Sequence, residues 1–161
     1  MKRTLTPLSD CGQTAREIAR IVNRYYKDLD LILYLRPGGR QSQPIGKMTL
    51  QEFFNFIKNI PFKVDEKPIE YVARPYYIMK ERGIDCKKKT IMVASFLKLH
   101  DIPFRLIGSS IRPDGKIHHI FPRAFINRQW RTIDATYPEN QIFRGRHNTT
   151  EVIFYDSKQQ G

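Results

Sequence analysis

The stretch from Cys86 to Leu99 places the strongest constraint on the fold, because its side chains are apolar over much of a helical surface. A helix without a wide polar face is buried by its neighbours instead of lying on the surface of the domain. Pro103 ends any helical continuation, because a proline disfavours helical backbone in the residue before it. The sequence therefore predicts a central, buried helix that begins at Cys86.

Two further helices are expected on the N-terminal side of this one. The first spans Gln13–Asp28, where apolar residues recur at helical spacing, and Asp10 can cap it. The second spans Leu50–Asn59 and begins with a capping box, in which Thr49 and Glu52 satisfy each other's backbone N–H groups. Each helix has an apolar face that can pack against a core.

Short strands are expected in the rest of the chain. Leu31–Leu35 is a candidate strand, and Arg36–Gly46 is a loop by its composition. Residues 62–82 give no clear prediction, since Pro75 interrupts any long helix there. After the central helix the pattern predicts four strands, which are Phe104–Ser109, Lys116–Ile126, Gln129–Thr136 and Thr150–Tyr155. The 161 residues thus indicate one α+β domain, with a helical part over 1–100 and a sheet part over 101–156.

The chain is strongly basic, with 28 Lys and Arg against 16 Asp and Glu, a formal charge of +12 and a pI of about 9.9. Such a charge favours an acidic partner, for example nucleic acid, or serves solubility alone. The sequence has neither an apolar stretch of membrane-spanning length nor an apolar leader after its first residues. Its two cysteines are too few for a disulfide framework. We therefore expect a cytoplasmic protein with a free thiol, or one associated with a virion, and no membrane partner.

Cys86 is the first candidate for chemistry. In the first turn of a helix, the free backbone N–H groups and the positive end of the helix dipole stabilise a thiolate, and three lysines follow directly. A buried, inert cysteine is the alternative, because that is a common state of free thiols. Cys11 lacks such neighbours and is interpreted as structural or incidental.

Strand parity selects the histidine that can work with this thiol. If Asn127 and Arg128 form a two-residue hairpin turn, His119 and Asp134 project from the same face of the sheet. They are then diagonal neighbours within side-chain reach of each other, and His118 points to the opposite face. A three-residue turn would slip the register by one, and His118 would then be the candidate base instead.

Pro122 complicates the strand that contains these histidines. Proline has no backbone N–H and removes one donor from the ladder of hydrogen bonds. The strand is therefore expected at a sheet edge or bulged at this point, and a bulge would change the parity.

Together these features resemble the transglutaminase-like superfamily, whose members share a papain-like fold. The common pattern is a G-D-C start, an apolar helix ending in G-I-P-x-R, then H-x-W-x-E-V and a W-x-x-x-D-P-T close. The counterparts here are Gly83–Cys86, Asp101–Arg105, His119–Phe121 and Trp130–Thr136, so the resemblance covers about Gly83 to Pro138. It implies that Cys86 is the nucleophile, His119 the general base and acid, and Asp134 the carboxylate that orients the histidine.

The chain departs from that pattern at several positions. An extra residue, Ile84, enters the G-D-C start, and Ala135 replaces the proline of D-P-T. No tryptophan precedes Cys86, so an indole donor to the oxyanion is missing. The N–H of Cys86 can supply one donor. The second donor is open among three side chains, which are Gln51, Tyr71 and Tyr76.

Two classes of function rank ahead of a third, a plain nucleic-acid binder that uses its aromatic side chains for stacking. The first is an enzyme whose thiol attacks a peptide or carboxamide carbonyl of a protein or peptide substrate, with hydrolysis favoured over transamidation. The second is a non-catalytic binding or assembly module, phage-associated for example, that uses a basic surface on the same fold. Neither a metal nor a cofactor is expected, since the sequence has no C-x-x-C or H-x-x-x-H spacing.

Overall fold

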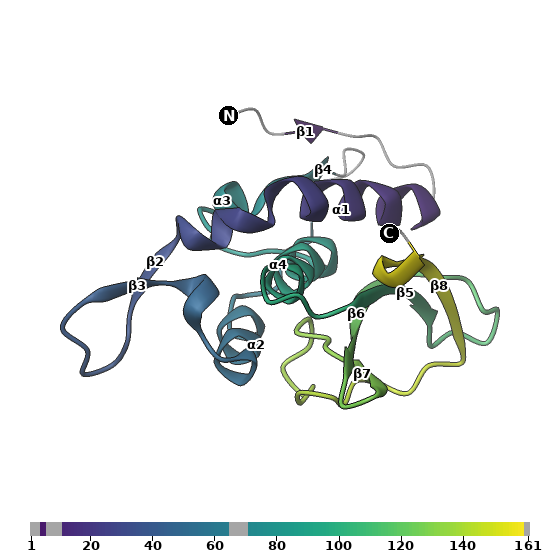
Figure 1. Cartoon of the computed structure of the whole chain (residues 1–161). Helices are drawn as coiled ribbons and strands as arrows, with labels where there is room; N and C mark the ends of the chain where they lie inside the picture. Colours follow the sequence, from purple (N-terminus) through teal and green to yellow (C-terminus); the bar gives the residue numbers. More distant parts are fainter. Residues whose placement is uncertain (1–3, 6–10, 65–70, 160–161) are drawn as a thin grey trace.

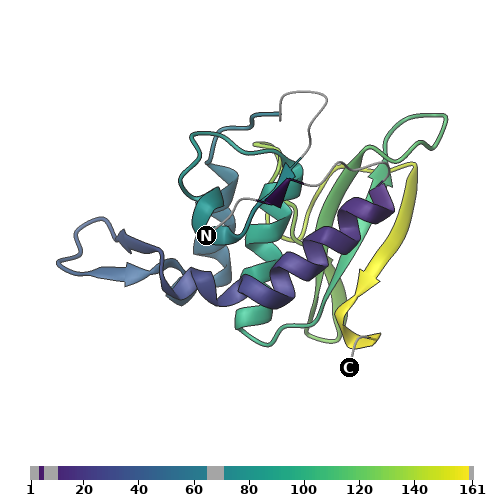
Figure 2. The same cartoon turned by 90° about the horizontal axis from the view of Figure 1, so that it is seen from above.

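Helix α4 (Cys86–Leu99) runs through the centre of the computed structural model, which describes residues 4–5, 11–64 and 71–159. Helices α1 (Cys11–Tyr25) and α2 (Leu50–Lys58) pack against α4, and a four-stranded antiparallel sheet covers another side (Figure 1). Figure 2 shows α1 lying across α4 and alongside this sheet. The bounds of α4 and its burial agree with the prediction, and the fold class is α+β with antiparallel sheets.

The N-terminal helix differs from the prediction at both ends. It ends at Tyr25, and the chain continues as a 3-10 helix, η1 (Tyr26–Asp30), where an α-helix to Asp28 was expected. Asp28 is buried and accepts two hydrogen bonds from the Arg74 guanidinium, at 2.7 and 2.5 Å. This buried pair fixes the chain where α1 ends. The expected cap, Asp10, lies outside the described residues.

Residues 31–47 include a hairpin that projects from the body of the molecule (Figures 1 and 2). Strand β2 (Leu33–Leu35) pairs with β3 (Ser42–Pro44), and η2 (Ile45–Lys47) returns the chain to the core. The strand prediction for 31–35 is confirmed over 33–35, but the loop prediction for 36–46 is wrong over 42–44. Composition could not show this pairing, which depends on Gly38 turning the chain back with a φ of +76°.

Helix α2 begins as the sequence predicts. The Thr49 side chain accepts a hydrogen bond from the Glu52 N–H at 3.1 Å, and Glu52 accepts one from the Thr49 N–H at 3.4 Å. Farther along, β4 (Tyr71–Val72) pairs with β1 (Thr4–Leu5), and the short helix α3 (Pro75–Ile78) follows. Its proline starts this helix instead of interrupting a longer one, since the first turn does not need the missing N–H.

The main sheet has the strand order β7-β6-β5-β8, and all neighbouring strands are antiparallel. Its strands are β5 (Phe104–Ser110), β6 (His119–Ile126), β7 (Gln129–Thr132) and β8 (Thr150–Asp156). A 3-10 helix, η3 (Ser157–Gln159), follows the last strand. All four predicted strands are present, although β6 begins at His119 instead of Lys116 and β7 ends at Thr132 instead of Thr136.

The hairpin between β6 and β7 has the two-residue turn that the sequence predicts. Ile126 pairs with Gln129 across the turn. Asn127 and Arg128 both have positive φ, 54° and 63°, as a type I′ turn requires. The register is therefore the one on which the choice of His119 depended.

Pro122 explains why β7 is short. It lies in β6, an interior strand, so the expected edge position is wrong, and the irregularity in the sheet lies instead between β5 and β8 at Leu106 and Ile107. The Ile133 N–H donates to the Pro122 carbonyl at 3.0 Å, but Pro122 has no N–H to return the second bond of that pair. The ladder ends here, and the chain leaves the sheet just before Asp134.

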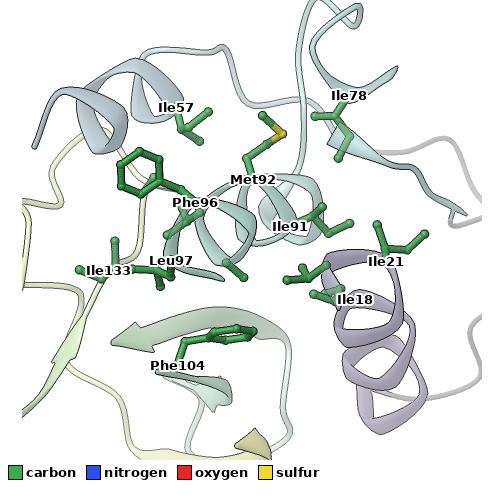
Figure 3. Packing of buried hydrophobic residues seen from close by; sticks show 14 of the residues in the cluster. Ile18, Ile21, Ile57, Ile78, Ile91, Met92, Phe96, Leu97, Phe104 and Ile133 are labelled. Carbon is green, nitrogen blue, oxygen red and sulfur yellow. The ribbon is translucent and has the colours of Figure 1, made fainter. Parts of the chain in front are cut away.

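One hydrophobic cluster joins the helices to the sheet. Figure 3 shows Ile91, Met92 and Phe96 of α4 among side chains of the other elements. These neighbours are Ile18 and Ile21 of α1, Ile57 of α2, Ile78 of α3, Phe104 of β5 and Ile133 after β7. Within the described ranges, no helix combines the length and the apolar character needed to cross a membrane.

Candidate active site

Cys86 is the first residue of α4 and lies half-buried at its N-terminus. Asp85 caps the helix, because its side chain accepts a hydrogen bond from the Lys88 N–H at 3.0 Å. The thiol therefore lies beside the free N–H groups of the first helical turn, where a negative charge is stabilised. The side chain of Cys11 lies outside the described part of the chain.

The three lysines that follow the thiol are buried and bound to other groups. Lys87 and Lys88 form ion pairs with nearby carboxylates, at 2.6 and 3.2 Å. Lys89 donates to the backbone carbonyls of Lys58 and Ile60, at 3.2 and 2.8 Å, and burial lowers its pKa. Other groups therefore compensate most of this positive charge, which the sequence alone did not indicate.

His119 is the first residue of β6 and is only 7% exposed. Its Nε2 lies 2.7 Å from Asp134 Oδ2, and the Cys86 side chain lies near enough to raise the pKa of the ring through hydrogen bonding and charge. Because Asp134 occupies Nε2, Nδ1 is the ring nitrogen available to the sulfur. The structure thus brings together the three residues that the sequence pattern selected.

These contacts determine the charge of His119. Burial is the largest single influence and lowers the pKa of the imidazole. The hydrogen bonds to Asp134 and Cys86, together with the charges of both groups, act in the opposite direction and prevail, so the pKa of His119 is raised from 6.5 to about 9. In this arrangement the ring is protonated at neutral pH, and an imidazolium faces the thiol.

Asp134 is held by backbone and side-chain contacts just beyond the end of β7. It is buried, its Oδ1 accepts the Thr136 N–H at 3.1 Å, and its backbone carbonyl accepts a hydrogen bond from Asn140 Nδ2 at 3.1 Å. Oδ2 is thereby left to face His119. Thr136 belongs to the D-A-T stretch of the sequence pattern, whereas nothing in that pattern indicated Asn140.

His118 has a different environment from its neighbour. It is exposed, it precedes β6, and its Nε2 accepts a hydrogen bond from the Ile111 N–H at 3.1 Å. Partial burial lowers the pKa of His118, and the positive charge of Arg112 acts in the same direction. The choice of His119 by strand parity therefore agrees with the geometry.

Tyr137 is a residue beside the pair that the sequence did not indicate. Its ring centroid lies 5.1 Å from that of His119, and the Arg146 guanidinium lies 3.4 Å from the Tyr137 centroid. Burial raises the pKa of the Tyr137 phenol, and the charges of Asp134 and Cys86 add to this, while Arg146 opposes it. Residues 137–146 form neither a helix nor a strand, so no periodic pattern could have indicated these contacts.

The three side chains proposed as the second oxyanion donor have no assigned role in the structure. Gln51 donates to Asn55 along the exposed side of α2, and the Tyr76 ring contacts Tyr77 and Lys80. The Tyr71 side chain lies outside the described residues, so the second oxyanion donor has no assignment. Among the described side chains, no group of three or more His, Cys, Asp or Glu is arranged to hold a metal ion.

No protein-family model matches the chain, and a search of curated proteins finds no match. Among solved structures, the chain is similar to a protein from Cytophaga hutchinsonii described as "a Putative Cysteine Protease", with 13% sequence identity and a TM-score of 0.44. The alignment covers 87% of this chain and 51% of that protein, so the chain spans about half the length of the protein it matches. At this identity and TM-score, neither the fold family nor the activity of the chain is inferred from that protein.

Proposed function

We propose that the chain is a thiol-dependent enzyme that cleaves peptide or carboxamide bonds with Cys86, His119 and Asp134. One observation supports this above all: buried His119 contacts both the thiol of Cys86 and the carboxylate of Asp134. Thiol catalysis requires a nucleophile, a base and a group that orients the base, each within hydrogen-bond reach of the next.

The reaction begins at a thiolate paired with an imidazolium. Cys86 Sγ attacks the carbonyl carbon of the substrate, and the S–C bond forms while the carbonyl π electrons move to the oxygen. When the tetrahedral intermediate collapses, the C–N bond breaks and His119 Nδ1 gives its proton to the leaving amine. Asp134 stabilises the imidazolium before this transfer and keeps Nδ1 directed to the sulfur.

The second half of the reaction releases the thioester. Water attacks the thioester carbonyl, His119 Nδ1 takes a proton from the water, and the C–S bond breaks to give a carboxylic acid and the thiolate. The N–H of Cys86 is one hydrogen-bond donor to the oxyanion in both halves. If a lysine amine attacks instead of water, the product is an isopeptide bond. Hydrolysis is favoured here because it needs no second protein substrate.

We further infer that the fold is a papain-like core of the transglutaminase-like kind. Helix α4 begins at the thiol and packs on β6, which begins at the histidine. The carboxylate follows β7, the next strand of the same sheet. The order and placement of these three elements support the resemblance that the sequence shows from Gly83 to Pro138.

A binding or assembly module on the same fold is the second candidate. The formal charge of +12 favours it, because a strongly basic surface attracts an acidic partner such as nucleic acid. In such a module Cys86 would have no catalytic role, and the reactivity of its thiol would not depend on His119. The two candidates therefore differ in the chemistry of Cys86.

The pH dependence of iodoacetamide alkylation at Cys86 tests the proposal, in a Cys11→Ser background so that one thiol remains. We expect Cys86 to react readily at neutral pH, because an imidazolium lies beside it. His119→Ala should slow the reaction at neutral pH by about tenfold or more, since the thiolate loses its counter-charge.

His118→Ala is the matched control, because it removes the neighbouring histidine, whose ring is bound to the Ile111 N–H instead. Its alkylation profile should match that of the parent protein. An ordinary thiol that is indifferent to His119 would overturn the enzyme proposal and favour the binding module.

A further inference from the structure

The proposed reaction does not account for a pocket beside His119. Ser109 of β5 and His119 of β6 line it from the sheet, and Tyr137 and Arg146 line it from the loop that follows Asp134. It is a small pocket of about 30 Å³, and part of it is open to solvent. In the proposed reaction, His119 protonates the leaving amine, and His119 lines this pocket. A group bound there would therefore belong to the part of the substrate that carries the leaving amine, called the leaving side below.

Two arginines line the pocket, and the glutamates that pair with them lie outside its lining. Arg123 and Arg146 both line it, while the only carboxylate among its lining residues is Asp134, which is bound to His119. A small anionic group that enters the pocket would therefore meet positive charge without a competing free carboxylate in the lining.

Ser109 gives independent evidence for a ligand. It is 1% exposed and lines the pocket, and its hydroxyl oxygen makes no hydrogen bond with any described residue. Buried polar groups are nearly always satisfied, so an unsatisfied hydroxyl in the lining of a pocket indicates a position that a bound group completes.

Arg146 is the arginine of this pocket whose present carboxylate partner can be replaced by a carboxylate of the substrate. Its guanidinium is held over the Tyr137 ring and donates to Glu139 at 2.7 Å. The side chains of this pair are 40% and 55% exposed, and exposed ion pairs contribute little, so another carboxylate can replace Glu139 at small cost. Arg123, in contrast, is held by two hydrogen bonds to Glu151, at 2.7 and 2.6 Å.

We propose that this pocket binds a carboxylate of the substrate, carried by the leaving amine, through Arg146 and Ser109. The assignment to the leaving side rests on the proposed function, because it follows from the role of His119. The favoured substrates then carry a carboxylate close to the bond that is broken, either at a chain terminus or in an acidic side chain. Until such a substrate binds, Arg146 stays paired with Glu139.

Binding of small carboxylates to the Cys86→Ala protein, followed by NMR, tests this without any thiol chemistry. N-acetylglycine represents a terminal carboxylate, the α-amide of N-acetylglutamate represents an acidic side chain, and N-acetylglycinamide is the neutral control. We expect the signals of Ser109 and Tyr137 to shift saturably with at least one acid, with a dissociation constant on the order of millimolar, and not with the neutral amide. The acid that binds more tightly identifies the source of the carboxylate.

Three variants make the test specific. Arg146→Gln should weaken binding about tenfold or more, whereas Arg144→Gln removes the same charge from an exposed residue of the same loop, outside the pocket, and should leave binding unchanged. Glu139→Gln should tighten binding, because it removes the competing carboxylate.

Equal losses in Arg146→Gln and Arg144→Gln, equal shifts with acid and amide, or no saturable shift would each overturn the carboxylate pocket. The probes bind without Cys86, so such a failure would leave the alkylation result untouched. Conversely, a thiol that is indifferent to His119 would remove the assignment to the leaving side and leave the binding result standing.

Discussion

Among the individual side chains, His119 links the candidate site to the stability of the fold. Its raised pKa means that the folded state binds the proton more tightly than the unfolded chain, in which the imidazole keeps its ordinary value of 6.5. The resulting stabilisation is complete below pH 6.5 and is lost as the pH rises through about 9.

We therefore expect the free energy of unfolding to fall between pH 6.5 and about 9 by more in the wild type than in His119→Gln. Urea unfolding of both proteins across this range measures the difference.

Asp134→Asn should lower the pKa of His119, because a neutral amide no longer favours the imidazolium, and NMR of the ring can follow this. A wild-type ring that titrates at its ordinary value would contradict the pairing.

Residue types and spacing were sufficient to predict that His119 and Asp134 lie together and that Cys86 begins a helix, because strand parity and the start of a helix are local properties of a sequence. They were not sufficient for Tyr137 or Arg146. These two residues reach the histidine through an irregular loop, and the path of such a loop depends on tertiary packing and not on any periodic pattern.

Among the strands, the β6–β7 hairpin fixes the register between His119 and Asp134. Arg128 in its turn has a φ of 63°, which is costly for a residue with a side chain. We expect Arg128→Gly to raise the free energy of unfolding by roughly 1 kcal/mol, because Asn-Gly is the preferred pair for a type I′ turn. Chemical denaturation measures the change.

Arg40→Gly is the control for this substitution, since Arg40 is an exposed loop residue whose φ is not positive. Glycine there should not stabilise the protein, because it only adds freedom to the unfolded chain. If both substitutions changed stability equally, strain at Arg128 would have no part in the effect.

The same hairpin shows why strand ends escaped prediction. A strand continues only while its neighbour offers donors and acceptors, so the end of β7 was determined by Pro122 on the facing strand and not by the residues of β7 itself. The pairing of residues 42–44 escaped prediction for a similar reason, since it needs the turn at Gly38 to bring β2 and β3 together.

At the level of the complete fold, stability depends on the side chains that surround α4. Phe53 of α2 is fully buried and stacks on Phe96 with ring centroids 4.3 Å apart. Phe53→Ala is expected to lower the free energy of unfolding by about 3–5 kcal/mol, measured in urea. Leu33→Ala truncates a side chain that is 62% exposed on the projecting hairpin, and should change it by less than about 0.5 kcal/mol. Comparable losses would contradict a core centred on α4.

Cys86 begins the central helix, whereas His119 and Asp134 come later in the chain and belong to the sheet region. During synthesis, the residues of α4 are therefore present before those of β6 and β7 have been added. Until the sheet docks on the helix, the thiol has neither His119 nor Asp134 beside it. If Cys86 has the proposed catalytic role, completion of folding is therefore also the step that assembles the active site, and an incompletely folded chain has no active thiol with which to attack its neighbours.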